Sequence, residues 1–450
     1  GGVDGAGKGE TVNVLNEWMD PRHIQTNAPG EPSDEERERP PMWRFWRLLP
    51  PKGKIGIFFG AWHTAPIVRR VYGETTEAEL EKSVHEIVRF ERMLCDEGAI
   101  VLKFWFHLSK RRQKKRLRAL EKDPRTRWRV TDTDWKHFAL YDRFREVSER
   151  TLRMTSTAEA PWHIVEGSDA RYRSMFVGKT ILGAIRRRLD AIAAAAAAPK
   201  VEPAAPPAEP RLDNRHILSA LDLTGKIAKE DYEDQLEKLQ GRLNLLSRKK
   251  RFKRRSIIAV FEGFDAAGKG GAIRRVTQAL DARQYRIIPI AAPNEEERAQ
   301  PYMWRFWRHI PRLGRVTIFD RSWYGRVLVE RVEGFCKPAD WMRAYGEIND
   351  FEDQLASYGI ILFKFWLTLS KEEQLRRFKE REETRFKRFK ITEEDWRNRE
   401  KWELYESAVC DMIEKTSGGR APWTLVPAED KYFARIQVLT TLCEGIEAAL

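Results

Sequence analysis

Short apolar runs rich in β-branched residues alternate with amphipathic stretches along the second half of the chain. The apolar runs cover residues 256–263, 286–292, 316–320, 360–367 and 422–426. Helical periodicity fills the intervals, as in AIRRVTQAL (272–280) and DFEDQLASY (350–358). Continuous apolar strands separated by helices predict a parallel sheet with helices on both faces, an α/β doubly wound fold. Ligands of such sheets bind at the carboxyl ends of the strands.

The same pattern occurs twice, because the chain is a tandem duplication. GVDGAGKG at residues 2–9 recurs as GFDAAGKG at 263–270, and the same offset of 261 residues aligns MWRFWR at 42–47 with MWRFWR at 303–308. One offset fits nearly the whole length, so we predict two copies of one domain, residues 1–190 and 212–450. The first copy opens inside its glycine-rich loop, and we expect its leader and first strand to lie upstream of Gly1.

An Ala/Pro tract, residues 191–211, joins the two copies and predicts an extended, stiff linker. A charged stretch, residues 212–255, follows as a predicted helical leader and ends in the basic run RKKRFKRR. Such a run forms either a solvated face or an anion-attracting patch.

Composition narrows the class of protein. The chain has 82 Lys and Arg against 68 Asp and Glu, a net charge of +14, which favours an anionic partner. No run reaches the roughly 20 apolar residues of a membrane helix, and no signal pattern opens the chain, so we expect a cytoplasmic protein without a membrane partner. Four widely spaced cysteines exclude a disulfide framework and a zinc knuckle.

The second copy contains a phosphate loop in its expected context. A strand runs into GFDAAGKG, and a helix follows. Gly263, Gly268 and Gly270 are predicted to let backbone N–H groups face phosphate oxygens, and Lys269 adds a positive charge. These features predict a fold like that of the P-loop kinases.

The metal ligands must lie elsewhere in this copy. Gly270 stands where a nucleotide-triphosphatase loop has Ser or Thr to hold Mg²⁺. Asp265 in the loop and Asp320 at the end of an apolar strand are the predicted ligands of Mg²⁺, with Mn²⁺ as a substitute. Arg321 and Arg326 flank Asp320 and are predicted to neutralise phosphate charge during catalysis.

The first copy lacks this second half of the site. Phe59, Gly60 and Ala65 align with the aspartate and the two arginines. We therefore expect the first copy to carry out no phosphoryl transfer.

Two further groups of arginines are predicted to bind phosphate. Arg377, Arg381, Arg385 and Arg388 recur at spacings of four, four and three, which predicts one face of a lid helix lying against a polyanion; a solvated face is the alternative. Arg305 and Arg308 lie three apart in MWRFWR, so they are predicted to share a helix face and to reach the acceptor phosphate.

The strings FEGFDAAGKGG, IFDRSWYGR and RFKRFKITEEDW resemble the polyphosphate kinase 2 family, and the resemblance spans both copies. The whole sequence resembles the two-domain members of this family, and this implies transfer of phosphate from inorganic polyphosphate to AMP with Mg²⁺. It also implies catalytic roles for Asp265, Lys269, Asp320, Arg321 and Arg326 and donor binding by the lid.

Three alternatives remain open on the sequence. They are a polyphosphate-dependent ADP or GDP kinase, an ATP-dependent nucleoside monophosphate kinase, and a non-catalytic nucleic-acid-binding protein. The chain shows no aromatic-rich RNA module and no recognition helix, so we expect no nucleic-acid partner. Whether the chain forms a homo-oligomer is also open.

Overall fold

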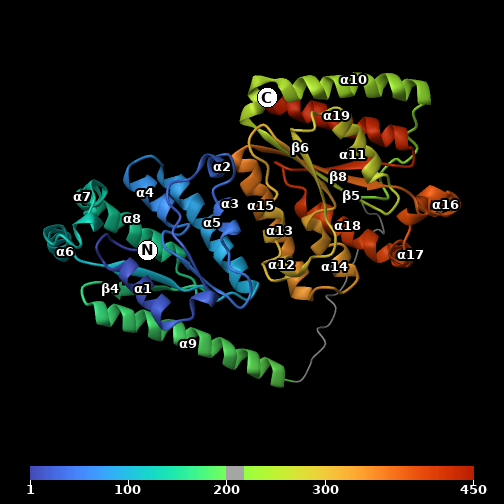
Figure 1. Cartoon of the computed structure of the whole chain (residues 1–450). Coiled ribbons are helices and arrows are strands. Elements are labelled where there is room, and N and C mark those ends of the chain that lie inside the picture. The colour runs from blue at the N-terminus through green and yellow to red at the C-terminus, as the bar shows by residue number, and fades with distance from the viewer. Residues whose placement is uncertain (199–216) are drawn as a thin grey trace. The chain divides into compact units, whose positions relative to one another are not determined.

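The structure is a computed structural model that describes residues 1–198 and 217–450 (Figure 1). It contains two compact units. Unit 1 comprises Gly1–Ser33, Arg44–Val201 and Asn294–Arg305, and unit 2 comprises Asp34–Trp43, Glu202–Pro293 and Phe306–Leu450. Each unit therefore includes a short segment of the other copy, and the two segments correspond to each other in the repeat.

Unit 2 is built on five parallel strands in the order β6-β7-β5-β8-β9. Their bounds are β5 (Ser256–Gly263), β6 (Tyr285–Pro289), β7 (Val316–Asp320), β8 (Ile360–Thr368) and β9 (Trp423–Pro427). The central strand β5 is buried along nearly its whole length, as expected for a strand covered on both faces. The predicted doubly wound α/β fold is confirmed.

Helices cover both faces of this sheet. α11 and α19 lie together on one face with α10 alongside α19, while α15 and α18 pack together on the other (Figure 1). The α-helices of the second copy that lie wholly in unit 2 are α10 (Lys229–Arg248), α11 (Lys269–Gln278), α14 (Val329–Val332), α15 (Pro338–Tyr358), α16 (Lys371–Glu383), α17 (Glu393–Glu400), α18 (Trp402–Thr416) and α19 (Lys431–Ala449). Short 3₁₀ turns are η3 (Lys250–Arg254), η4 (Trp323–Arg326) and η5 (Arg385–Lys390), and α2 (Asp34–Arg37) also belongs to this unit.

Unit 1 repeats this order of elements around two separate parallel pairs, β1 with β2 and β3 with β4. The strands are β1 (Ile24–Asn27), β2 (Ile55–Phe58), β3 (Lys103–His107) and β4 (Trp162–Glu166). Gly2, which aligns with the last residue of β5, forms a single parallel bridge with Phe106.

The helices of unit 1 surround these pairs. They are α1 (Lys8–Trp18), α4 (Thr64–Val71), α5 (Glu77–Asp96), α6 (Lys110–Lys122), α7 (Asp132–Ala139), α8 (Tyr141–Thr155), α9 (Ala170–Ala197), α12 (Glu295–Arg298) from the second copy, and α3 (Trp43–Arg47) apart from its first residue. Two 3₁₀ turns, η1 (Pro21–His23) and η2 (Arg127–Arg129), complete the unit, and α13 (Trp304–Trp307) follows α12 in the chain.

The predicted extended linker is wrong at its start. α9 continues through the alanine run to Ala197, because alanine has the highest helix propensity and nothing interrupts the helix there. The rest of the predicted linker, from residue 199, lies outside the described residues. The predicted helical leader is present as α10, followed by η3.

Two expectations from composition can be compared with the described residues. All four cysteines are free thiols. No helix within residues 1–198 or 217–450 is long and apolar enough to span a membrane.

Candidate active site

The phosphate loop of unit 2 connects the end of β5 to the start of α11. Gly263 and Gly268 have φ angles of 149° and 107°, which side chains disfavour. A Cβ at Gly263 would lie 2.3 Å from the carbonyl oxygen of Leu367. The loop therefore needs glycine at Gly263 for space and at both positions for backbone conformation.

Lys269 folds back over this loop. Its Nζ donates hydrogen bonds to the carbonyl oxygens of Gly263 at 2.6 Å and Phe264 at 3.3 Å. Burial lowers the pKa of Lys269, and the nearby carboxylates of Asp265 and Asp320 oppose that effect. The predicted lysine and both predicted aspartates thus lie within electrostatic reach of one another.

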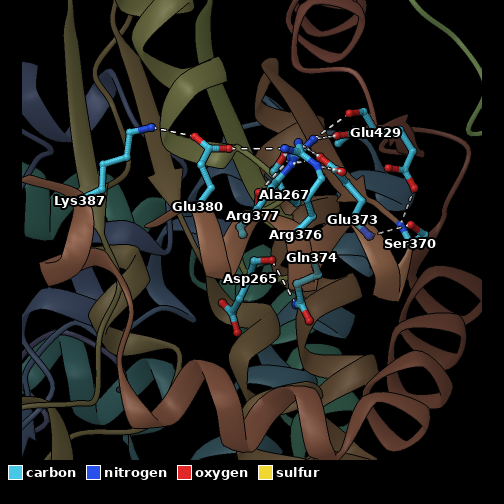
Figure 2. Close-up of polar contacts among 12 residues, drawn as sticks. Asp265, Ala267, Ser370, Glu373, Gln374, Arg376, Arg377, Glu380, Lys387 and Glu429 are labelled. Carbon is cyan, nitrogen blue, oxygen red and sulfur yellow. Dashed lines mark hydrogen bonds and ion pairs between the residues drawn. The ribbon is translucent and has the colours of Figure 1, made fainter. Parts of the chain in front are cut away.

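Asp265 is contacted from three directions. Its Oδ1 accepts a long hydrogen bond of 3.4 Å from Arg321 Nη2, and its Oδ2 accepts one of 2.9 Å from Asn398 Nδ2. Its backbone carbonyl oxygen accepts a hydrogen bond of 3.1 Å from Gln374 Nε2 in the lid helix α16 (Figure 2). Asp265 is therefore held both by Arg321, the residue after β7, and by Gln374 and Asn398 on helices α16 and α17.

Asp320 ends β7 opposite Phe261 of β5, at the carboxyl edge of the sheet. Within the described part of the chain, its carboxylate has no hydrogen bond and no ion pair. The described residues also hold no cluster of three or more His, Cys, Asp or Glu arranged for a metal. Asp320 and Asp265 are the two carboxylates near Lys269 that could hold Mg²⁺, which keeps several waters and binds through one or two carboxylates plus substrate phosphates.

Arg321 has a strained backbone, with a φ of 63° in the left-handed region. Its backbone N–H donates to the carbonyl oxygen of Phe261 at 3.0 Å, and its guanidinium contacts Asp265. Gly60, the aligned residue of the first copy, has a φ of 83°, which glycine adopts without strain. Unit 2 thus keeps an arginine at a position where the backbone favours glycine, as strained functional residues often do.

The aromatic residues that follow Arg321 anchor the segment to the core. Trp323 Nε1 and Tyr324 OH donate to Glu352 Oε1 at 3.0 and 2.6 Å, and Lys364 Nζ lies 2.7 Å from Glu352 Oε2. All four side chains are buried. Arg326, three residues from the tryptophan, pairs with Glu330 at 2.8 Å.

Two further polar residues of this region, Glu262 and Ser322, were not among those predicted from the sequence. Glu262 is buried at the end of β5, where burial raises its pKa, and it accepts a hydrogen bond of 2.8 Å from Ser322 Oγ. The aligned residues of the first copy are Gly1 and Ala61. A residue-by-residue comparison of the copies, beyond the motifs, would have singled out both.

The predicted arginine stripe on one lid helix is wrong. α16 ends before Thr384, whose extended backbone stops the helix, while its N–H and hydroxyl both donate to the carbonyl oxygen of Glu380. Arg385 and Arg388 therefore lie on η5, and only Arg377 and Arg381 lie on α16.

Arg377 does not face a polyanion as predicted. Its side chain is 3% exposed, and its Nε pairs with Glu373 at 2.6 Å. Its Nη1 donates to the carbonyl oxygens of Ala266 and Ala267, and its Nη2 donates to those of Ala428 and Glu429 (Figure 2). Because its donors are taken up by the protein, Arg377 fastens the lid helix to the phosphate loop.

The other predicted phosphate-binding arginines are placed differently from one another. Arg385 and Arg388 are exposed, and Arg388 Nε donates to the carbonyl oxygen of Glu382 at 2.7 Å. Arg305 is buried and pairs with Glu297 at 3.2 Å, whereas Arg308 follows the end of α13 and is exposed. The prediction that Arg305 and Arg308 share a helix face is wrong, because α13 ends at Trp307.

The first copy retains the loop geometry without the rest of the site. Lys8 Nζ donates to the carbonyl oxygens of Gly2 and Val3, as Lys269 does in its own loop. Asp4 Oδ2 lies 2.8 Å from His137 Nδ1, and His137 aligns with Asn398.

A single carboxylate of unit 1 pairs with three arginines. Glu10 lies in the first turn of α1 and pairs with Arg116 at 2.8 Å, with Arg129 at 3.2 Å and with Arg173. The residue aligned with Glu10 in the second copy is Gly271, which carries no charge. Three arginines of unit 1 are thus paired with an internal carboxylate that the second copy lacks.

The comparisons with known proteins agree with this geometry. The model of the family described as polyphosphate kinase 2 matches residues 1–191 and 226–450. The chain belongs to the polyphosphate kinase 2 family. The predicted resemblance is therefore confirmed for both copies.

Individual members of the family differ in how much of the chain they match. A polyphosphate:AMP phosphotransferase of Pseudomonas aeruginosa is 60% identical over 100% of this chain and 90% of its own length. An ADP-polyphosphate phosphotransferase of the same species is 38% identical over 50% of this chain and 73% of its own length. A crystal structure of a putative polyphosphate kinase 2 from that species, 57% identical, superposes with a TM-score of 0.88 and covers 100% of this chain and 89% of that chain.

Proposed function

We propose that this protein transfers the terminal phosphoryl group of inorganic polyphosphate to AMP, giving ADP. The observation that carries this proposal is the full-length match to a polyphosphate:AMP phosphotransferase. The relative named for ADP matches only half of the chain, which favours AMP over ADP as the acceptor.

The reaction exchanges one phosphoanhydride bond for another. An oxygen of the AMP phosphate attacks the terminal phosphorus of polyphosphate, and the bond from that phosphorus to the bridging oxygen breaks. The products are ADP and a polyphosphate one unit shorter. Positioning of the two phosphates and stabilisation of the transferring charge supply most of the catalysis.

The phosphate loop and the residues that follow β7 would have different roles in this reaction. Backbone N–H groups of the loop and the Lys269 ammonium would bind the phosphates, and Arg321 and Arg326 would stabilise the charge that develops during transfer. Asp265 would position the acceptor or its metal. Arg385 and Arg388 are exposed on the lid and would attract the polyphosphate donor.

The proposal includes Mg²⁺, with Mn²⁺ as a substitute. Asp320, with its free carboxylate, would be the principal protein ligand, and Asp265 would be the second. When bound, the metal supplies charge neutralisation between the donor and acceptor phosphates. The prediction that the protein acts in the cytoplasm belongs to this proposal as well.

Donor and acceptor choice test the proposed function. The protein is incubated with AMP and Mg²⁺ and either polyphosphate or ATP, and then with ADP or GDP in place of AMP. We expect ADP from AMP with polyphosphate and loss of this activity with a chelator. ADP formed only with the ATP donor, or faster turnover of ADP or GDP than of AMP, would contradict the assignment.

A further inference from the structure

The lid continues from α16 through η5 into α17. A side chain of α17 reaches the carboxylate of Asp265 in the phosphate loop. Asn398 on α17 donates a hydrogen bond of 2.9 Å from its Nδ2 to Asp265 Oδ2. An ionised carboxylate can only accept hydrogen bonds, so the amide nitrogen must face Asp265 and the amide oxygen must face away. The orientation of this amide therefore matters for the contact.

Tyr405 fixes that orientation. Its hydroxyl oxygen lies 3.1 Å from Asn398 Oδ1 and 3.4 Å from Glu333 Oε1. Burial raises the pKa of Tyr405, and the nearby carboxylate of Glu333 raises it further, so the hydroxyl keeps its proton. A protonated tyrosine can donate to the amide oxygen, which leaves the amide nitrogen directed at Asp265.

Glu333 fastens the same part of the lid to the end of α14. Its side chain is only 4% exposed and pairs with Lys401 at 2.8 Å and with Arg397 at 3.1 Å. These two cations come from α17 and from the residue that separates α17 from α18. We call Asn398, Tyr405, Glu333, Arg397 and Lys401 together the lid latch.

The first copy keeps the contact but replaces its polar support. His137 binds Asp4 at 2.8 Å in place of the asparagine. Tyr72 and Phe144 align with the glutamate and the tyrosine of the lid latch, and their ring centroids lie 6.1 and 5.0 Å from that of His137. The second copy, which has Asp320 and Arg321, thus surrounds this contact with polar side chains, whereas the first copy surrounds it with aromatic rings.

We propose that Asn398 is a positioning residue for the phosphoryl transfer, holding the Asp265 carboxylate through the lid latch. The assignment rests on the proposed function. Among the described residues, the carboxylate of Asp265 has one other side-chain partner, Arg321, at a long 3.4 Å. Without the amide, Asp265 is free to close on Arg321, which would draw both groups away from the substrates.

Three substitutions separate a positioning role from a structural one. Asn398→Asp has nearly the same shape but places a second carboxylate against Asp265, Asn398→Ala removes the donor, and Asn398→His introduces the residue of the first copy. We expect kcat to fall about 10- to 100-fold in the alanine variant, as for the loss of a hydrogen bond to a charged group, and further in the aspartate variant. The histidine variant should recover most of kcat, and the KM values for AMP and polyphosphate should stay within about threefold.

Matched controls and a second readout keep the test independent of turnover. Glu400→Gln, an exposed change on the same helix, and His137→Ala, at the aligned position of the first copy, should leave kcat unchanged. Hydrogen exchange of the amides of residues 393–400 should accelerate in the alanine and aspartate variants.

Near-wild-type kcat in Asn398→Asp, or losses confined to KM, would overturn the proposal. A wild-type protein that makes no ADP from AMP and polyphosphate would contradict the proposed function, while hydrogen exchange would still test the latch.

Discussion

The two copies differ at individual residues of the candidate site. Arg321 occupies a left-handed backbone conformation that its counterpart Gly60 adopts without strain. Such strain in a non-glycine residue costs about 1–2 kcal/mol. The second copy therefore tolerates a locally unfavourable residue whose guanidinium contacts Asp265.

Replacing Arg321 by glycine should separate stability from activity. Arg321→Gly relieves the backbone strain, so we expect an unfolding temperature at or above that of the wild type, together with a loss of turnover of about 100-fold or more. The reverse change in the first copy, Gly60→Ala, should lower the free energy of unfolding by about 1 kcal/mol with turnover unchanged. A large loss of stability in Arg321→Gly would show that the arginine is structural.

Glu262 should make stability depend on pH. Burial raises the pKa of this carboxyl in the folded state, so folding binds a proton that the unfolded chain releases at the same pH. Stability from this group is present at low pH and is lost as the pH rises through the raised pKa. Glu262→Gln mimics the protonated form; thermal unfolding should therefore show little difference from wild type at acidic pH and a growing advantage of the variant as the pH rises through the raised pKa of Glu262. A difference that shrinks with rising pH would contradict this assignment.

Among the elements, the lid helix α16 is joined to the phosphate loop by the buried side chains of Arg377 and Gln374 and not by a basic stripe. Arg377 and Arg376 share the partner Glu373, yet their side chains are 3% and 62% exposed. Hydrogen bonds from Arg376 lower the pKa of Glu373 to about 2, although burial opposes them. Only Arg377 also reaches the carbonyl oxygens of the phosphate loop and of the segment after β9.

These two neighbours provide a matched test of the lid. Arg377→Ala leaves carbonyl oxygens of the phosphate loop and of the segment after β9 without their donor and removes one of the two arginines that pair with Glu373, and we expect the free energy of unfolding to fall by about 3 kcal/mol or more. Arg376→Ala removes an exposed pair and should cost at most about 1 kcal/mol. Chemical denaturation measures both values. Equal losses would mean that the buried network does not hold the lid.

At the scale of the whole molecule, the chain pairs a complete site with an incomplete copy. Unit 1 has the loop lysine and the loop aspartate, but Phe59 replaces the second carboxylate, and Glu10 pairs with three arginines. Unit 2 has Asp265, Lys269, Asp320 and Arg321 near one edge of the sheet, whereas Arg326 pairs with Glu330. The two copies therefore differ in chemistry while sharing an order of elements.

Matched lysine variants test this division. Lys269→Ala should abolish ADP formation, because it removes the positive charge of the only loop that has Asp320 beside it. Lys8→Ala should retain most of the turnover, since its copy lacks that carboxylate. ADP formation from AMP and polyphosphate is the measurement, and equal losses in the two variants would show that the first copy is catalytic.

Much of the fold and the loop could be predicted because their signals are local. Apolar runs specify buried parallel strands, and the glycine-rich segment between a strand and a helix specifies the phosphate loop. The arginine stripe failed because it assumed an uninterrupted helix. Thr384 ends that helix, and the burial of Arg377 depends on carbonyl oxygens more than 50 residues away along the chain.

The sequence by itself determined the duplication, the α/β fold, the phosphate loop and the loss of Asp320 and both arginines from the first copy. Only the tertiary structure decided which arginines are exposed, that Glu262 is buried beside Ser322, and that Asn398 reaches Asp265. The reason is physical. Hydrophobic periodicity and glycine geometry act between neighbours in the chain, whereas the partners of a polar side chain are set by which distant elements the fold brings together.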